Sequence, residues 1–161
     1  MVTTRKWSMN KLWWVLGILI ILLLGMFSLA ELVPVSLFNS KELASPSDWI
    51  KEQQIKVYPT QVVIDVNNPV WASFTNTNSM DPFIDETSNA IEIKPNSPLD
   101  IKVGDVISYQ TKQGVIIHRV VKVDRDEKGI YYLVKGDNNI ITDPFKIRFN
   151  EVVGVVVAVI Y

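Results

Sequence analysis

Side chains of the three kinds used in nucleophilic acyl transfer lie on separate segments of this chain. Ser79 stands in a polar stretch between two apolar runs, His118 is the only histidine, and the aspartates Asp137 and Asp143 come further along. The chemistry needs a weak hydroxyl nucleophile, a base of suitable pKa, and a carboxylate that orients the base. Composition alone does not select these residues from the other serines and aspartates.

Taken singly, each of these residues has an ordinary structural explanation. Serine and aspartate are common in turns, where their side chains bond to nearby backbone groups. A histidine inside an apolar strand is more often a packing residue than a base. A catalytic interpretation therefore depends on the order in which all of them occur.

The composition limits the classes of protein to consider. With 161 residues, 48% of them hydrophobic and 20% charged, the chain suits one globular domain and an appendage. The net charge of -1, with basic residues scattered among acids, argues against a nucleic-acid partner. The absence of cysteine excludes disulfides, thiolate zinc sites and a cysteine nucleophile, and a single histidine argues against a metal site.

The N-terminal segment, residues 1–35, is predicted to be a cytoplasmic tip followed by a transmembrane anchor. Residues 12–30 contain no charge, and roughly 20 apolar residues of helix cross a bilayer. Basic residues precede this run, which places the N-terminus in the cytoplasm and the remaining chain outside it. The expected location is therefore the cell membrane, with a single pass. The residues that indicate it are Arg5, Lys6 and Lys11 and the interfacial tryptophans Trp7, Trp13 and Trp14.

A cleavable signal peptide is the main alternative to this anchor. Ser28-Leu29-Ala30 has the small-x-small pattern of a cleavage site. The apolar run is long for a signal core and continues past Glu31, which favours an uncleaved anchor. Both interpretations place the following residues outside the cytoplasm.

Residues 36–56 are predicted to be a linker and a short amphipathic helix. Ser45-Pro46-Ser47-Asp48 has a capping serine, a proline at the first helical position and an acid in the first turn. Trp49, Ile50 and Ile55 would form its apolar side, which packs on the domain or rests on a membrane surface.

Residues 57–161 are predicted to form a mainly β domain, antiparallel and either barrel-like or built of two packed sheets. Short β-branched and aromatic runs alternate with turn signals, and no long helical pattern separates them. Residues 126–129 are predicted to be a hairpin loop. The predicted strands are 62–66, 71–74, 91–93, 106–109, 115–123, 130–134 and 152–160.

Four short motifs in this region resemble a known family when they are taken in order. They are Ser79-Met80-Asp81-Pro82, Gly104-Asp105-Val106, His118-Arg119-Val120, and Lys135-Gly136-Asp137-Asn138-Asn139 followed by Asp143. Together they resemble the type I signal peptidases, specifically the archaeal and endoplasmic-reticulum branch, over about the last two-thirds of the chain. An N-terminal anchor with an external domain is also that family's usual layout.

The resemblance implies a membrane-bound serine endopeptidase that removes signal peptides after small residues and needs no cofactor. It implies Ser79 as nucleophile and His118 as general base, where bacterial relatives have a lysine. It also implies Asp143 as the orienting carboxylate and Asp137 as a second acid, while the sequence leaves open which of the two completes the triad. Thr77, two residues before the nucleophile, would help the backbone N–H of Ser79 to stabilise the oxyanion.

The expected partners are signal peptides of secretory preproteins, bound as extended strands, and the lipid bilayer. Whether a translocon or accessory subunits take part stays open. One alternative is a repressor-type peptidase with a Ser/Lys pair, for which Lys122 or Lys135 would be the base. The other is a non-catalytic anchored β domain that serves as an accessory subunit.

Overall fold

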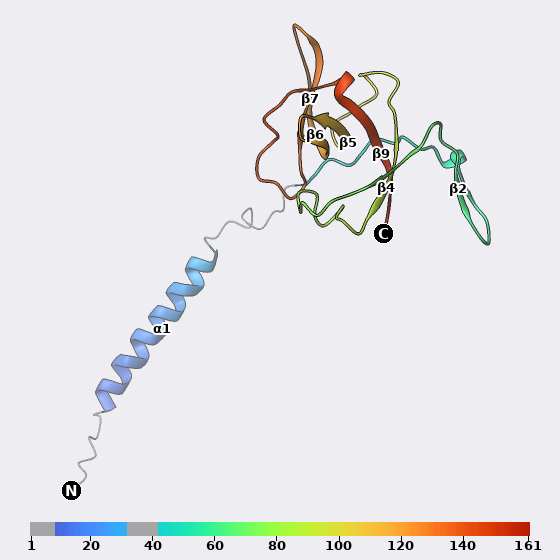
Figure 1. Ribbon diagram of the computed structural model, residues 1–161. Coiled ribbons are helices and arrows are strands. Elements are labelled where there is room, and N and C mark those ends of the chain that lie inside the picture. Colours follow the sequence, from blue (N-terminus) through green and yellow to red (C-terminus); the bar gives the residue numbers. More distant parts are fainter. Residues whose placement is uncertain (1–8, 32–41) are drawn as a thin grey trace. The chain divides into compact units, whose positions relative to one another are not determined.

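The computed structural model of the chain describes residues 9–31 and 42–161 (Figure 1). The chain divides into two compact units, Met1–Glu42 and Leu43–Tyr161. The predicted cytoplasmic tip before residue 9 and the predicted linker over residues 36–41 lie outside the described residues.

The first unit contains one helix, α1, over Met9–Glu31. Its sequence is rich in leucine, a strong helix former, and contains no proline. The described side chains, from Trp13 to Leu24, are almost all exposed. Within residues 9–31 and 42–161 the structure contains no helix with the combined length and hydropathy expected of a membrane span.

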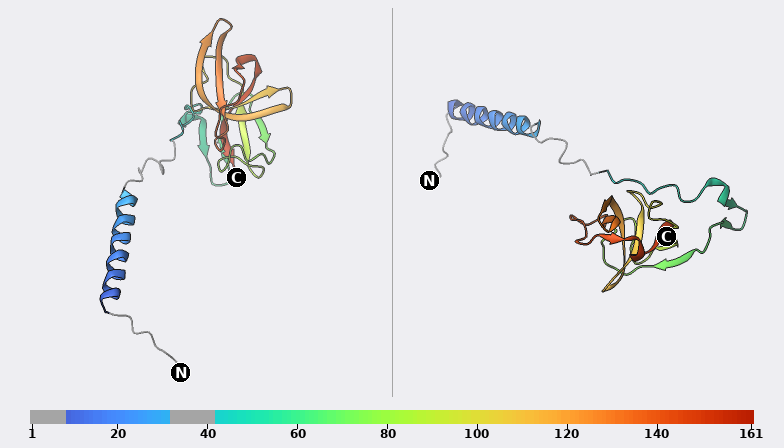
Figure 2. Two further views of the ribbon diagram at one scale, coloured as in Figure 1. Left: turned by 90° about the vertical axis from the view of Figure 1, so that its left-hand side faces the viewer. Right: turned by 90° about the horizontal axis from the view of Figure 1, so that it is seen from above.

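The second unit is mainly β and antiparallel, which confirms that part of the predicted fold class. Seven strands form one sheet in the order β3-β4-β9-β5-β6-β7-β8, and β1 pairs with β2 in a separate hairpin. This hairpin projects from the main sheet (Figures 1 and 2). The strands are β1 Ile55–Val57, β2 Val62–Ile64, β3 Val70–Ser73, β4 Asn89–Ile93, β5 Val106–Thr111, β6 Gly114–Asp126, β7 Gly129–Lys135, β8 Ile147–Arg148 and β9 Val152–Ile160.

All seven predicted strands are present, and the sheet is open, with β3 and β8 as its edges among the described residues. The chain also forms β1 and β8, which were not predicted. They have three and two residues, too few to show an alternating pattern.

The central strands are buried on both faces. Successive side chains of a strand point to opposite faces, so Val106 and Ile107 of β5 belong to different apolar clusters. This two-sided burial explains the continuous apolar runs in the sequence. One cluster contains Ile101, Ile107, Tyr109, Val120, Tyr132, Val134, Ile147, Val152 and Val155, and the other contains Met80, Ile84, Ala90, Val106 and Val156.

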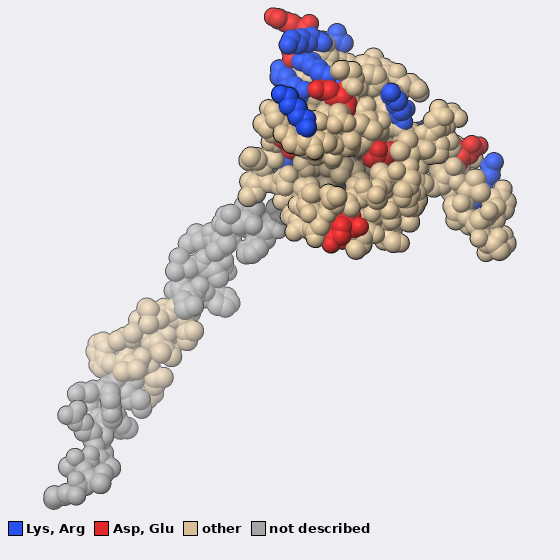
Figure 3. Space-filling view, in the orientation of Figure 1, with Lys and Arg blue, Asp and Glu red and all other residues tan. Residues whose placement is uncertain are grey.

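The predicted hairpin loop between β6 and β7 is confirmed. Asp126 pairs with Gly129, which has a φ of 102°, and the N–H of Lys128 donates to the Asp126 carboxylate. Charged side chains of both signs gather at this end of the molecule (Figure 3). Asp126 binds Lys146 and Arg148 there, and these partners lower the pKa of its carboxyl.

The helix predicted to begin at Ser45 is wrong. Residues 42–49 form neither a helix nor a strand, and the nearest helical turn is a 3-10 turn over Glu52–Gln54. The N–H of Ser47 donates to the buried Asp105 carboxylate at 2.6 Å, and the carbonyl of Ser45 occupies the space that a Cβ on Gly104 would take. These tertiary contacts override the local capping signal, because helix propensity is a weak preference. Residues 43–56 belong to the same compact unit as the strands of the main sheet.

Candidate active site

The turn that carries Ser79 follows edge strand β3. Asn78 has a φ of 55°, in the left-handed region that asparagine tolerates better than most residues. Met80 and Ile84 are buried, and the N–H of Ile84 donates to the Met80 carbonyl at 3.0 Å. Ser79 itself is half-buried. The turn is thus anchored by its apolar residues while the serine stays accessible.

A second turn, residues 135–139, holds the first one in place. The N–H of Asn138 donates to the Ser79 carbonyl at 3.0 Å, and its side-chain amide donates to the Asn78 carbonyl at 2.9 Å. Gly136 packs against the Ser79 carbonyl so closely that a Cβ would clash with it. Gly136 and Asn138 of the motif at residues 135–139 therefore have a structural role, which is to position the turn that carries Ser79.

His118 and Asp143 form a hydrogen-bonded pair beside this turn. His118 Nδ1 lies 2.8 Å from Asp143 Oδ2, and the two side chains are 8% and 13% exposed. The N–H of Asp143 donates to the Val134 carbonyl at 2.9 Å, which ties the loop after β7 to that strand. An ionised carboxylate only accepts hydrogen bonds, so Nδ1 carries the proton and Nε2 is left as the basic nitrogen.

Tyr109 of β5 also donates its hydroxyl to Asp143 Oδ2. Burial is the main cause that raises the pKa of this phenol, and the hydrogen bond to Asp143 and its charge add to the effect. The hydroxyl therefore stays protonated and is a permanent donor. Sequence reasoning missed Tyr109, although Ile107 pairs with His118 and a residue two positions further along β5 shares that face.

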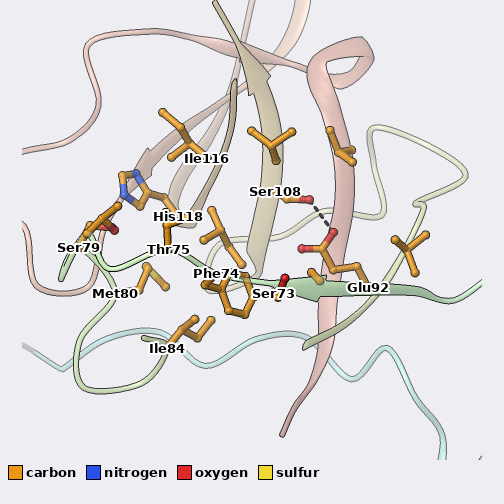
Figure 4. A pocket seen from close by; sticks show the side chains of 16 residues that line it. Ser73, Phe74, Thr75, Ser79, Met80, Ile84, Glu92, Ser108, Ile116 and His118 are labelled. Atoms are coloured by element: carbon orange, nitrogen blue, oxygen red, sulfur yellow. Dashed lines mark hydrogen bonds between the residues drawn. The ribbon is translucent and has the colours of Figure 1, made fainter. Parts of the chain in front are cut away.

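Ser79, Thr77 and His118 line one pocket of about 540 Å³. Figure 4 shows Ser79 and His118 beside each other at one end of it. Thr77 Oγ1 and Ser79 Oγ are hydrogen-bonded at 3.1 Å. Among the described residues no hydrogen bond joins Ser79 to the imidazole, and catalytic hydrogen bonds often form only when substrate binds.

Asp137 is placed against Arg119 and not against His118. Its two carboxylate oxygens accept from Arg119 Nε and a terminal nitrogen at 2.8 and 2.7 Å. Both side chains are less than a tenth exposed, and Arg119 also donates to the carbonyls of Ala44 and Gly104. Through these contacts the buried ion pair links the turn 135–139 to the irregular segment that contains Ala44. Sequence reasoning missed the contribution of Arg119.

We expect Asp137→Asn to destabilise the β unit by about 3 kcal/mol, because removal of one partner leaves the Arg119 charge buried and incompletely paired. Denaturant unfolding of the full chain in detergent measures this loss. Asp124→Asn is the matched control, since Asp124 pairs with Lys122 on the surface and such pairs contribute little. Equal losses in the two variants would contradict a structural role for the Arg119–Asp137 pair.

The two lysines considered as alternative bases are engaged elsewhere. Lys122 pairs with Asp124 at 2.7 Å on the surface, and the Asp124 carboxylate raises the pKa of its amine. Lys135 Nζ donates to the carbonyls of Gly136 and Asn139 at 3.0 and 2.6 Å. A lysine base must lose its proton in a desolvated site near the nucleophile, and neither lysine lines the pocket.

A buried carboxyl, Glu92 of β4, lines the same pocket and is 3% exposed. Burial raises the pKa of Glu92, and the hydrogen bond from Ser108 acts in the opposite direction with a smaller effect. Glu92 is the third residue that sequence reasoning missed, because the sequence of β4 has the pattern of an ordinary strand.

This raised pKa predicts a pH dependence of folding. Glu92 binds its proton more tightly in the folded state, so its contribution to stability is complete below the ordinary pKa of 4.5 and is lost as the pH rises through the folded-state value. Glu92→Gln cannot titrate. We therefore expect the unfolding free energy of wild type to fall relative to Glu92→Gln between pH 4 and the folded-state pKa, in denaturant titrations at a series of pH values. Parallel curves would contradict the prediction.

Among the described residues no group of three or more His, Asp or Glu side chains is arranged to hold a metal ion. Comparison with known proteins adds no relative: no family model matches the chain, and no curated protein matches its sequence.

Proposed function

We propose that the protein is a membrane-anchored serine endopeptidase that cleaves signal peptides from exported preproteins. One observation carries the proposal. His118 is hydrogen-bonded through Nδ1 to the buried Asp143, and it lines one pocket together with Ser79. The order of the four sequence motifs supports the same reaction class.

In this mechanism Ser79 Oγ attacks the carbonyl carbon of the cleaved bond while His118 Nε2 takes the hydroxyl proton. Asp143 keeps the imidazole oriented and stabilises its protonated form. His118 then gives the proton to the leaving amine, and water hydrolyses the acyl-enzyme by the same route. The Ser79 N–H has no protein acceptor among the described residues, which leaves it free, with the Thr77 hydroxyl, to stabilise the oxyanion.

The shape of the pocket suits an extended peptide. Val70, Ala72 and Ser73 of edge strand β3 line one part of it, and residues 115–117 of β6 line another. A β3 edge without a neighbour offers main-chain groups for pairing with a substrate strand. The mostly apolar lining favours apolar side chains of the bound peptide.

The direct test uses the full chain in detergent and a model preprotein with a signal peptide. We expect two products, and mass spectrometry should place the cut after a small residue at the end of the signal peptide. A preprotein with a bulky residue at that position is the matched control. No cleavage by the folded protein, or cutting without regard to that residue, would contradict the proposal.

The proposed topology is a single membrane pass through the uncharged residues 12–30, with the N-terminus in the cytoplasm. The basic residues Arg5, Lys6 and Lys11 before this run motivate it. In sealed vesicles with the cytoplasmic side inside, we expect added protease to cut the β6–β7 loop at its exposed residues Glu127 and Lys128 and to spare an N-terminal tag. A protected loop with an accessible tag would reverse the orientation.

A further inference from the structure

We propose that Glu92 and Ser108 form a polar subsite, at the end of the pocket away from Ser79, that binds a small hydroxyl side chain of the peptide. The occupant is a serine or threonine of the segment that spans the cleavage site. This inference rests on the proposed function, because it assigns one position of the same peptide substrate.

The subsite is built from three neighbouring strands. Glu92 belongs to β4 and Ser108 to β5, and β9 lies between these two strands in the sheet. Ser108 Oγ donates to Glu92 Oε2 at 2.7 Å, as Figure 4 shows by a dashed line. The contact spans β9 at Gly154, where a Cβ would lie 2.8 Å from Glu92 Oε2 and 3.0 Å from Glu92 Cβ. A residue without a side chain at position 154 is what leaves room for the glutamate.

The other oxygen of the carboxyl has no partner. Glu92 Oε1 is buried and makes no hydrogen bond among the described residues. Buried polar atoms are nearly always bonded, and one left without a partner lowers stability. The surrounding pocket is mainly apolar, with Ala72, Ile84 and Val153 in its lining, so an aliphatic residue at position 92 would suit folding better. The unsatisfied oxygen in a substrate pocket therefore indicates a ligand group that completes its hydrogen bonding.

A hydroxyl is the group that fits best. Burial raises the pKa of Glu92 and so favours the neutral acid, which is a poor partner for a cation. A neutral carboxyl can donate or accept at its free oxygen, and a serine or threonine hydroxyl can do the same. An alanine or valine in this position would leave the oxygen unsatisfied, and the cost of that discriminates against them.

The test measures peptide binding to full-length Ser79→Ala protein in detergent, so that binding is read without cleavage. Peptides spanning a model cleavage site carry alanine, valine, serine, threonine or lysine at each position in turn. At one position we expect serine and threonine to bind about tenfold more tightly than alanine and valine, the effect of one buried hydrogen bond. Adding Glu92→Met should reduce this preference to less than about twofold, whereas Glu92→Gln, which keeps a donor and an acceptor, should retain most of it.

Glu127→Gln is the matched control, because Glu127 is exposed in the β6–β7 loop. It should leave every preference unchanged. Circular dichroism and thermal unfolding establish that each variant is folded. If Glu92→Met does not fold, the peptide affinities of the Ser79→Ala protein alone still test the subsite. The absence of any peptide position that prefers serine and threonine would overturn it.

A preference for lysine, a hydroxyl preference that survives in Glu92→Met, or no peptide binding at all would also overturn the subsite. Cleavage assays with the wild-type chain separate the two proposals. Cleavage without a Glu92-dependent preference would refute the subsite and keep the peptidase function. A Glu92-dependent preference in binding without any cleavage would keep the subsite and refute the peptidase function.

Discussion

Ser79→Ala is expected to reduce preprotein cleavage by about 10³-fold or more, because the hydroxyl forms the covalent bond in the first step. The loss should appear in single-turnover cleavage of the model preprotein by the full chain in detergent. Folding should be unaffected. The turn depends on the buried Met80 and Ile84 and on backbone bonds from Asn138, and none of these contacts involves the serine hydroxyl.

Thr60→Ala is the matched control for this variant, since Thr60 is an exposed hydroxyl residue between β1 and β2, away from the pocket. It should cleave at the wild-type rate. Residual cleavage by Ser79→Ala within about tenfold of wild type would exclude Ser79 as the nucleophile, because loss of a nucleophile costs far more. A variant that is inactive and also unfolded would instead place Ser79 in the structural framework.

The second large effect concerns His118 and the pH dependence of cleavage. A general base must be neutral to accept the serine proton, so cleavage should fall when acidification protonates the imidazole. Glu92 lines the same pocket and burial raises its pKa, so an acidic limb of the rate profile is assigned to His118 by its loss in the variant without the histidine. His118→Ala should lose about 10³-fold in rate and should also lose this acidic limb.

Asp143→Asn tests the role of the carboxylate that orients His118, while His118 itself is kept. The amide removes the charge that stabilises the imidazolium, and we expect a loss of about 10²- to 10⁴-fold with the fold intact. The same substitution at Asp137 should act mainly on stability, because Asp137 pairs with Arg119. Circular dichroism at each pH confirms that loss of rate is not unfolding. If His118→Ala cleaves at the wild-type rate and its rate falls at acidic pH as the wild-type rate does, His118 is a packing residue.

The strand pattern of the second unit was predictable from sequence. Alternation and β-branched runs depend on local side chains, and so does the 126–129 hairpin, whose glycine adopts a positive φ. Prediction from local sequence patterns failed where contacts with residues distant in the sequence outweighed the local preference for a helix. The capping pattern at Ser45 predicts a helix, but this segment contacts Asp105 and Gly104 instead and forms no helix.

The sequence by itself offered a serine, one histidine and two aspartates as candidates for acyl-transfer chemistry, because the motifs that contain them resemble those of one family when taken in order. Only the tertiary structure decided which aspartate serves the histidine. Asp137 and Asp143 are six positions apart, yet the first faces Arg119 and the second faces His118. The register of β6 and β7 and the backbone bond from Asp143 to Val134 set that choice. Glu92 and Tyr109 were hidden for the same reason: their partners come from other strands, and pairing across a sheet leaves no local pattern in a single sequence.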